Sequence, residues 1–138
     1  MPPLTRWFLR TALAWLVLAM VLGLAIALPA VGSEALQAAL RPVWVHLLTV
    51  GWATQMIFGV AWWMFPRPAP ARSFGNPALG WSAYALLNAG LALRSLSEPA
   101  LATAPGPVVR AALLASAALQ FLATALFAVA IWRRVRGT

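Results

Sequence analysis

Residues 42–67, PVWVHLLTVGWATQMIFGVAWWMFPR, decide the fold, because this stretch combines the length of a membrane span with the only histidine in the chain. The 23 residues between Pro42 and Pro66 include no Asp, Glu, Lys or Arg. At ~1.5 Å per residue they form a helix of about 34 Å, enough to cross a bilayer core of ~30 Å. His46 then lies roughly one turn inside the membrane. An imidazole at that depth loses its hydration and needs a partner, so His46 is the first candidate for a functional group.

This predicted helix has two distinct faces when its residues are placed at about 100° intervals. The sector that holds His46 is otherwise apolar, and its members are Val50, Ala53, Ile57 and Val60. The opposite sector carries Gly51, Gln55 and Gly59 at every fourth position. Small side chains let a second helix approach closely, and a glutamine there can hydrogen-bond across the interface. The glycine face is therefore predicted to pack against another helix.

The composition indicates an integral membrane protein. The chain has 138 residues, of which 63% are hydrophobic and only 9% are charged, whereas soluble domains average about 25% charged residues. The absence of cysteine excludes disulfides, thiolate metal sites and cysteine nucleophiles. The net charge of +8 is carried by arginines at the ends of apolar segments. This placement is typical of membrane anchoring rather than of nucleic-acid binding.

The pattern of apolar runs predicts one all-α unit over residues 1–138, a polytopic membrane protein with four transmembrane helices. The predicted helices cover residues 8–29, 43–65, 78–97 and 109–132. The first is interpreted as a retained helix, because its apolar run is too long for the core of a signal peptide and three further spans follow. Ser33 is expected to cap a short interfacial turn before Pro42. Pro99, together with the prolines that follow it, is expected to mark a loop.

The distribution of arginine predicts the orientation. Seven arginines fall on the side of the two termini: Arg6, Arg10, Arg67, Arg72, Arg133, Arg134 and Arg136. The other side holds Arg41, Arg94 and Arg110 with both acids, Glu34 and Glu98. The excess of arginine predicts that both termini are cytoplasmic, in the inner membrane of a prokaryote. His46 then lies towards the outer side, where the spacing of Arg94 and Glu98 allows an ion pair at the end of a helix.

Three amides lie deep within the predicted spans. Tyr84 and Asn88 share a helix face, and Asn88, Gln55 and Gln120 are expected to hydrogen-bond between helices. A proton path is a weaker interpretation, because it would need a carboxylate in the membrane.

The inventory of reactive side chains restricts the chemistry of a single chain. One His, no Cys and two acids cannot build a zinc, calcium or di-iron site within one protomer, and a Ser-His-Asp triad lacks its acid. A haem needs one strong axial ligand per side, an apolar slot and basic partners for its propionates. His46 can supply the ligand, with Arg94 and Arg41 at a suitable height for the propionates. Without a family pattern, the sequence favours the simpler interpretation that His46 hydrogen-bonds a neighbouring backbone carbonyl or Tyr84. Whether the chain is an enzyme stays open.

The run HLLTVGWATQMIFGVAWWMFPR resembles the second transmembrane helix of the haem-copper oxidase catalytic subunit, particularly in the cbb3-type and nitric-oxide-reductase branches. In that family, a histidine near the outer end of this helix, followed by a Gly-Trp pair and a closing aromatic-Pro-Arg, ligates the low-spin haem. The matching residues here are His46, Gly51, Trp52, Pro66 and Arg67. RWFLRTALAWLVLAMVLGLAIAL and NAGLALRSLSEP resemble the first and third helices of that subunit. The resemblance implies a haem b cofactor with His46 as an axial ligand of the iron.

The resemblance also implies an oligomer, because the family's catalytic subunit has twelve helices with pseudo-threefold symmetry and this chain has the length of one third. A homotrimer is expected, and a dimer would allow two His46 side chains on one haem. The expected role is electron transfer, haem handling or small-gas binding. The histidines of the family's copper site and its tyrosine motif are missing, so oxygen or nitric-oxide reduction is not expected.

Two alternatives remain open at this point. One is a non-catalytic accessory or assembly subunit that packs on a larger oxidase through Gly51, Gln55 and Gly59. The other is a trimer that holds Zn or Cu on three symmetry-related His46 side chains.

Overall fold

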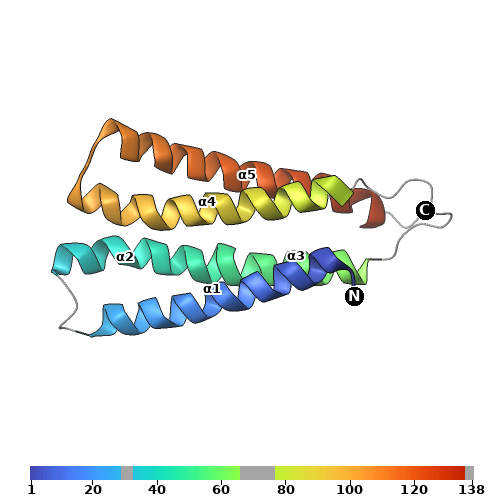
Figure 1. Cartoon of the computed structure of the whole chain (residues 1–138), viewed down its shortest axis with the longest axis horizontal. Helices are drawn as coiled ribbons and strands as arrows, with labels where there is room; N and C mark the ends of the chain where they lie inside the picture. The colour runs from blue at the N-terminus through green and yellow to red at the C-terminus, as the bar shows by residue number, and fades with distance from the viewer. Residues whose placement is uncertain (29–32, 66–76, 136–138) are drawn as a thin grey trace.

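The computed structural model describes residues 1–28, 33–65 and 77–135, with side chains as far as residue 132. The chain forms four long helical rods that run alternately up and down (Figure 1). They are α1 (Pro3–Ala27), a continuous rod made of α2 (Glu34–His46), η1 (Leu47–Thr54) and α3 (Gln55–Met64), then α4 (Pro77–Thr103) and α5 (Pro107–Val135). Since the described residues include no strand, the prediction of an all-α fold is confirmed.

In the view of Figure 1 the rods form a row, but at the end that holds the termini all four meet in one core, where Phe8 of α1 contacts Phe127 of α5. The rod α2–η1–α3 packs between α1 and α4, and α5 packs on the far side of α4 (Figure 1). The start of α1 and the end of α5 lie at the same end of the row. His46 lies towards the opposite end.

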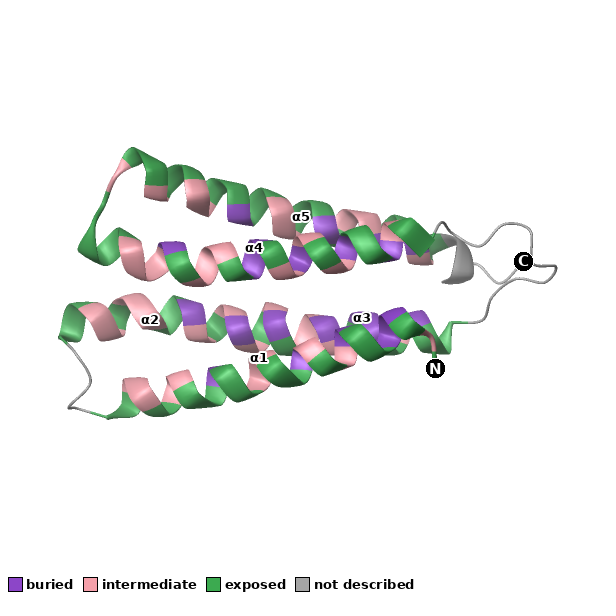
Figure 2. Cartoon of the chain, viewed as in Figure 1, coloured by how far each residue is buried: buried purple, intermediate pink, exposed green. Residues whose placement is uncertain are grey.

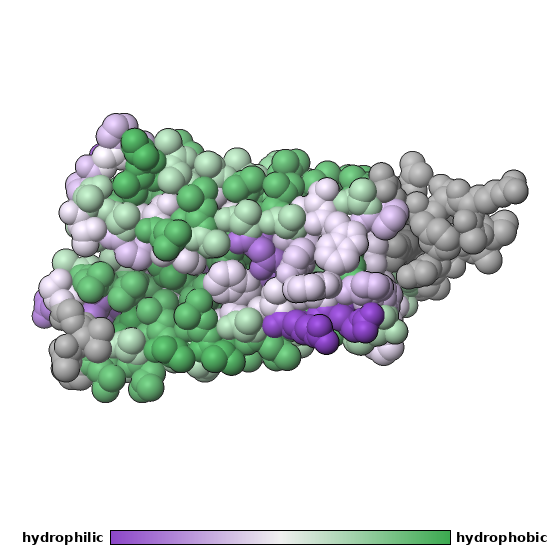
Figure 3. All heavy atoms as spheres, in the orientation of Figure 1, coloured by the Kyte–Doolittle hydropathy of each residue, from purple (hydrophilic) through white to green (hydrophobic). Residues whose placement is uncertain are grey.

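Three of the four rods are long and apolar enough to cross a membrane. They are Pro3–Ala27, Glu34–Met64 and Pro107–Trp132. Large hydrophobic side chains cover much of their outer surface (Figure 3). The helix α4 is long enough, with 27 residues, but it is not apolar enough to be counted with them. It carries Arg94 and Glu98 in its second half. The three apolar helices indicate a membrane protein.

Prolines and a serine mark the helix starts. The helices α1, α4 and α5 each begin at a proline, whose fixed φ suits the first turn and whose missing N–H would have no helical partner there. The hydroxyl of Ser33 accepts a hydrogen bond from the backbone N–H of Leu36 at 3.3 Å, so Ser33 caps α2 as predicted. Glu34 in the first turn favours the same helix end.

The helices extend further than the sequence predicts. The first begins at Pro3 rather than residue 8, the second at Glu34 rather than 43, and α4 continues past Pro99 to Thr103. Pro42 and Pro99 therefore lie inside helices, where each removes one backbone hydrogen bond. The added turns of α2 and α4 lie beside each other and form two walls of one cleft.

The π-helical segment η1 was missed by the sequence analysis. It occupies the eight residues directly after His46, and the Thr54 hydroxyl donates to the Thr49 carbonyl oxygen, five residues back, at 2.9 Å. A π turn holds more residues than an α turn, so each residue rotates the chain less. Val50 consequently packs against the core, while Ile57 and Val60 are exposed. The prediction that they share one apolar sector was wrong.

The core divides into two clusters along the row (Figure 2). The larger one lies near the termini and consists of Leu4, Phe8, Phe58, Trp62, Ala83, Leu87, Ala123, Phe127 and Ala130. The smaller one lies near His46 and consists of Ala19, Val43, Leu47 and Leu91. The ring of Phe127 on α5 stacks on Phe58 of α3, with centroids 3.7 Å apart and planes within 2°. This stack ties α5 to the rod beyond its neighbour α4.

Candidate functional site

His46 is the last residue of α2 and points towards α4. Its Nδ1 lies 2.8 Å from the carbonyl oxygen of Pro42 and 3.8 Å from Oε1 of Glu98. Because a carbonyl oxygen only accepts, Nδ1 carries a hydrogen, and in the neutral imidazole Nε2 keeps its lone pair. No described residue hydrogen-bonds Nε2, and the side chain is 27% exposed. An imidazole whose N–H is held by a backbone carbonyl and whose other nitrogen is free has the arrangement of a metal-ligating histidine.

The alternative prediction, that His46 hydrogen-bonds a backbone carbonyl or Tyr84, agrees with this geometry in part. The ring does hydrogen-bond a backbone carbonyl, but that carbonyl belongs to Pro42 of its own helix. Tyr84 instead makes edge-to-face ring contacts with Phe8, at a centroid distance of 5.2 Å, and with Trp7 and Trp81. The carbonyl contact occupies one nitrogen only, so it is compatible with both interpretations.

Arg94 and Glu98 form the ion pair that their spacing predicts. Arg94 Nε lies 2.8 Å from Glu98 Oε1, the same oxygen that approaches His46. The Glu98 side chain is 10% exposed, and its Oε2 is buried without a hydrogen-bond partner among the described residues. The structure therefore joins His46, Glu98 and Arg94 in one cluster between α2 and α4. Glu98 competes with any propionate for the Arg94 guanidinium.

An open cleft of about 600 Å³ lies beside this cluster, towards the end of the row. Its walls come from α2, α4 and α5: Ala35, Ala38, Ala39, Pro42, Arg94, Glu98, Leu101, Ala102 and Leu113. Apart from the arginine and the glutamate, these side chains are small or apolar. The cleft thus places one ion pair against a narrow apolar space.

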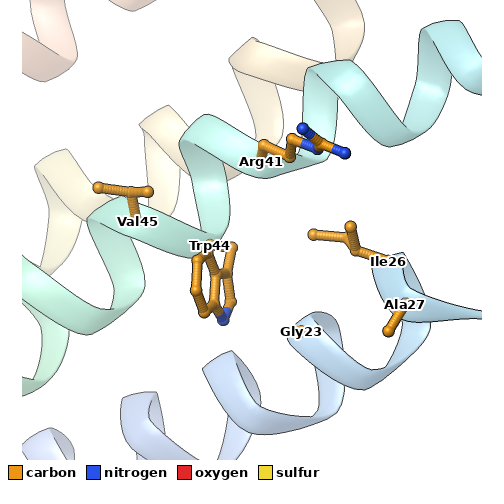
Figure 4. A pocket seen from close by; sticks show the side chains of 6 residues that line it. All are labelled: Gly23, Ile26, Ala27, Arg41, Trp44 and Val45. Atoms are coloured by element: carbon orange, nitrogen blue, oxygen red, sulfur yellow. The ribbon is translucent and has the colours of Figure 1, made fainter.

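Arg41 lies elsewhere. It faces the cleft between α1 and α2, together with Trp44 (Figure 4). Arg41 and His46 are five positions apart in the sequence. At 3.6 residues per turn this places them about 140° apart around the helix. The structure therefore brings Arg94 to His46 but does not bring Arg41 there.

The glycine face of the second rod packs inside the chain. Gly51, Gln55 and Gly59 are all buried. A Cβ added at Gly51 would lie 2.9 Å from the Cβ of Trp15 and 2.9 Å from Cδ2 of Leu91, so the glycine lets α1 and α4 approach. This face is filled by the chain's own helices and is not open to a second subunit.

A polar network crosses the middle of the row at Gln55. Gln55 Nε2 donates to Asn88 Oδ1 at 3.1 Å, and Asn88 Nδ2 donates back to Gln55 Oε1 at 3.2 Å. The Thr11 hydroxyl donates to Gln55 Oε1 and the Trp15 indole donates to Asn88 Oδ1, both at 2.8 Å. These four side chains join α1, α3 and α4 through neutral groups, as expected for interhelical hydrogen bonding. Gln120 differs, because its buried Nε2 has no partner among the described residues.

Breaking the amide pair is expected to destabilise the fold. Either Gln55→Leu or Asn88→Leu leaves buried partners unsatisfied and should lower the free energy of unfolding by about 1–2 kcal/mol. The double variant should lose less than the sum, as measured by thermal unfolding in detergent in a double-mutant cycle. Gln120→Leu is the control and should cost nothing, since its amide makes no described bond. Strictly additive losses would contradict the network.

Several contacts of the site were beyond the sequence analysis. The approach of Glu98 to His46 depends on how two helices are rotated against each other, which a single sequence does not specify. Thr11 and Trp15 gave a usable signal, because they lie four residues apart in the apolar first helix and so share a face.

Comparisons with known proteins add no relative: no family model, no curated protein and no solved structure matches the chain. Within the described ranges, no three His, Cys, Asp or Glu side chains are grouped to hold a metal ion. The functional argument therefore depends on the geometry around His46.

Proposed function

We propose that the chain is an integral membrane protein that binds haem b through Nε2 of His46, in an oligomer of identical chains. The observation that carries the proposal is the imidazole itself, with Nδ1–H held by the Pro42 carbonyl and Nε2 without a described partner. The hydrogen bond fixes the tautomer and the orientation of the ring. The proposed role is one of three: electron transfer through the haem, binding of a small gas to the haem, or handling of the haem itself.

The residues around His46 fit a haem. A single imidazole is sufficient as an axial ligand, whereas a zinc or copper site needs several. The same rod exposes Trp52, which offers aromatic surface to a porphyrin. Arg94 lies close enough to be shared between Glu98 and a propionate. Arg41 takes no part in this proposal, because it faces the other side of α2.

An oligomer supplies what one chain lacks. His46 is partly exposed, so one face of a bound porphyrin would remain uncovered in a monomer. A second copy provides the missing wall. We favour a closed homotrimer with one His46 per haem, and a dimer with two His46 side chains on one haem is the alternative. The proposal also includes the topology: all four rods span the membrane, and both termini are cytoplasmic. The less apolar α4 packs against α5, which shields it from lipid.

Two other functions are less well supported. An accessory subunit that docks through Gly51, Gln55 and Gly59 would need a face that α1 and α4 already occupy. A metal ion on three His46 side chains requires three Nε2 atoms to converge at a symmetry axis. An assembly that holds a metal ion has a different mass from one that holds haem, so mass spectrometry separates metal binding from haem binding.

Native mass spectrometry of the assembly released from detergent tests the proposal. The expected mass is that of two or three chains plus haem. His46→Ala should lose the haem, while Thr49→Ala, an exposed neighbour whose hydroxyl bonds its own helix at Val45, should keep it. A monomer without haem, or an oligomer that carries one Zn or Cu per three chains, would contradict haem binding.

A further inference from the structure

A second cleft, of about 440 Å³, opens between the end of α1 and α2, away from His46. It is lined by Gly23, Ile26, Ala27, Arg41, Trp44 and Val45 (Figure 4). Arg41 and Trp44 both extend from α2 towards α1, with the guanidinium above Ile26 and the indole beside Gly23. Most of the lining is apolar, and the charge is provided by one residue at the outer end of the cleft.

The indole of Trp44 has an unused donor. Its Nε1 is buried and has no hydrogen-bond partner among the described residues. A Cβ added at Gly23 would lie 2.8 Å from this nitrogen, so the absence of a side chain at Gly23 leaves the N–H facing the helix backbone at the cleft wall. The N–H is therefore covered by α1, and the indole lends its ring rather than its donor to the wall of the cleft.

Arg41 has no described counter-charge. The side chain is exposed, and both ion pairs among the described residues belong to Glu98. Its position, one turn before His46 on the same rod, puts it at the level where the apolar run begins. Lipid phosphates lie at this level of a bilayer, and a guanidinium pairs with phosphate oxygens through two parallel hydrogen bonds.

We propose that this cleft binds one anionic phospholipid. The phosphodiester accepts hydrogen bonds from the Arg41 guanidinium, and an acyl chain follows the apolar wall along Trp44, Ile26 and Val45. A headgroup with its own cation would bring that cation near Arg41, so an anionic headgroup binds more tightly than a zwitterionic one. This site is independent of His46, which faces α4.

Titration of the full-length protein in neutral detergent with dioleoyl phosphatidylglycerol tests the site, with thermal unfolding as the readout. Ligand binding to the folded state raises the melting temperature in proportion to the logarithm of ligand concentration. Wild type should be stabilised more by phosphatidylglycerol than by dioleoyl phosphatidylcholine. Arg41→Gln should weaken phosphatidylglycerol binding by about tenfold, because a charge-assisted pair is lost. Trp44→Ala removes part of the apolar wall and should weaken binding by a smaller factor.

Arg110→Gln is the matched control, because Arg110 is another exposed arginine outside the cleft and its loss should leave the response unchanged. The proposal is overturned if both lipids stabilise the wild type equally, or if Arg41→Gln responds like Arg110→Gln. It is also overturned if glycerol phosphate alone reproduces the effect at equal concentration, since the site would then take a free phosphate rather than a lipid. His46→Ala should retain the lipid response whatever its effect on haem.

Discussion

Replacing His46 by alanine is expected to remove haem from a protein that stays folded. His46 is the only imidazole of the chain, and its side chain bonds only its own helix and approaches Glu98 at 3.8 Å, so its loss costs little packing. Loss of the ligand itself should lower haem affinity by more than the about 10–100-fold typical of losing an outer partner. The measurement is Soret absorbance per chain, with far-ultraviolet circular dichroism to follow the helices.

Two controls make this result specific. Added imidazole should restore part of the haem absorbance to His46→Ala, because it can enter the space left by the ring and coordinate the iron. Thr49→Ala, on the same exposed side of the rod, should retain the full absorbance. If His46→Ala binds as much haem as the wild type, the ligand assignment is wrong.

Replacing Gly51 by valine is expected to cause the largest loss of stability. Already the first carbon of a side chain would lie 2.9 Å from Trp15 and from Leu91, on two different helices. Valine adds two more carbons, so α1 must move away and the Trp15–Asn88 hydrogen bond is strained or lost. Overpacking of this kind costs about 1–3 kcal/mol, and the added loss of the hydrogen bond places Gly51→Val at the upper end.

Thermal unfolding in detergent measures this effect against a glycine without neighbours. A Cβ at Gly106 would meet nothing within 4 Å, so Gly106→Ala should change the free energy of unfolding by no more than about 0.5 kcal/mol. Equal stability of the two variants would contradict the close approach of α1 to the second rod.

The features that the sequence predicted correctly are local ones. Uncharged runs of membrane length identified the rods, the position of Ser33 before Glu34 identified a helix cap, and a spacing of four identified the Arg94–Glu98 ion pair. Each depends on residues within a few turns of one helix. The amide pair of Gln55 and Asn88 also agrees with the expectation of interhelical hydrogen bonds.

The features that the sequence did not predict depend on packing between helices. The π segment after His46 has no distinctive composition, and the helices α2 and α4 continue through Pro42 and Pro99. Glu98 meets His46 across two helices whose relative rotation only the fold defines. The prediction of Arg41 at the His46 site is different, because the spacing of five positions, about 140° around the helix, could have argued against it.

The absorption spectrum of the detergent-purified wild-type protein, recorded oxidised and reduced, tests the central claim most directly. A haem held by His46 predicts a Soret band that shifts on reduction, with haem bound in a fixed ratio to the chain. A folded protein that is colourless, and that stays without a Soret shift after haem is added, would contradict the assignment of His46 as a haem ligand.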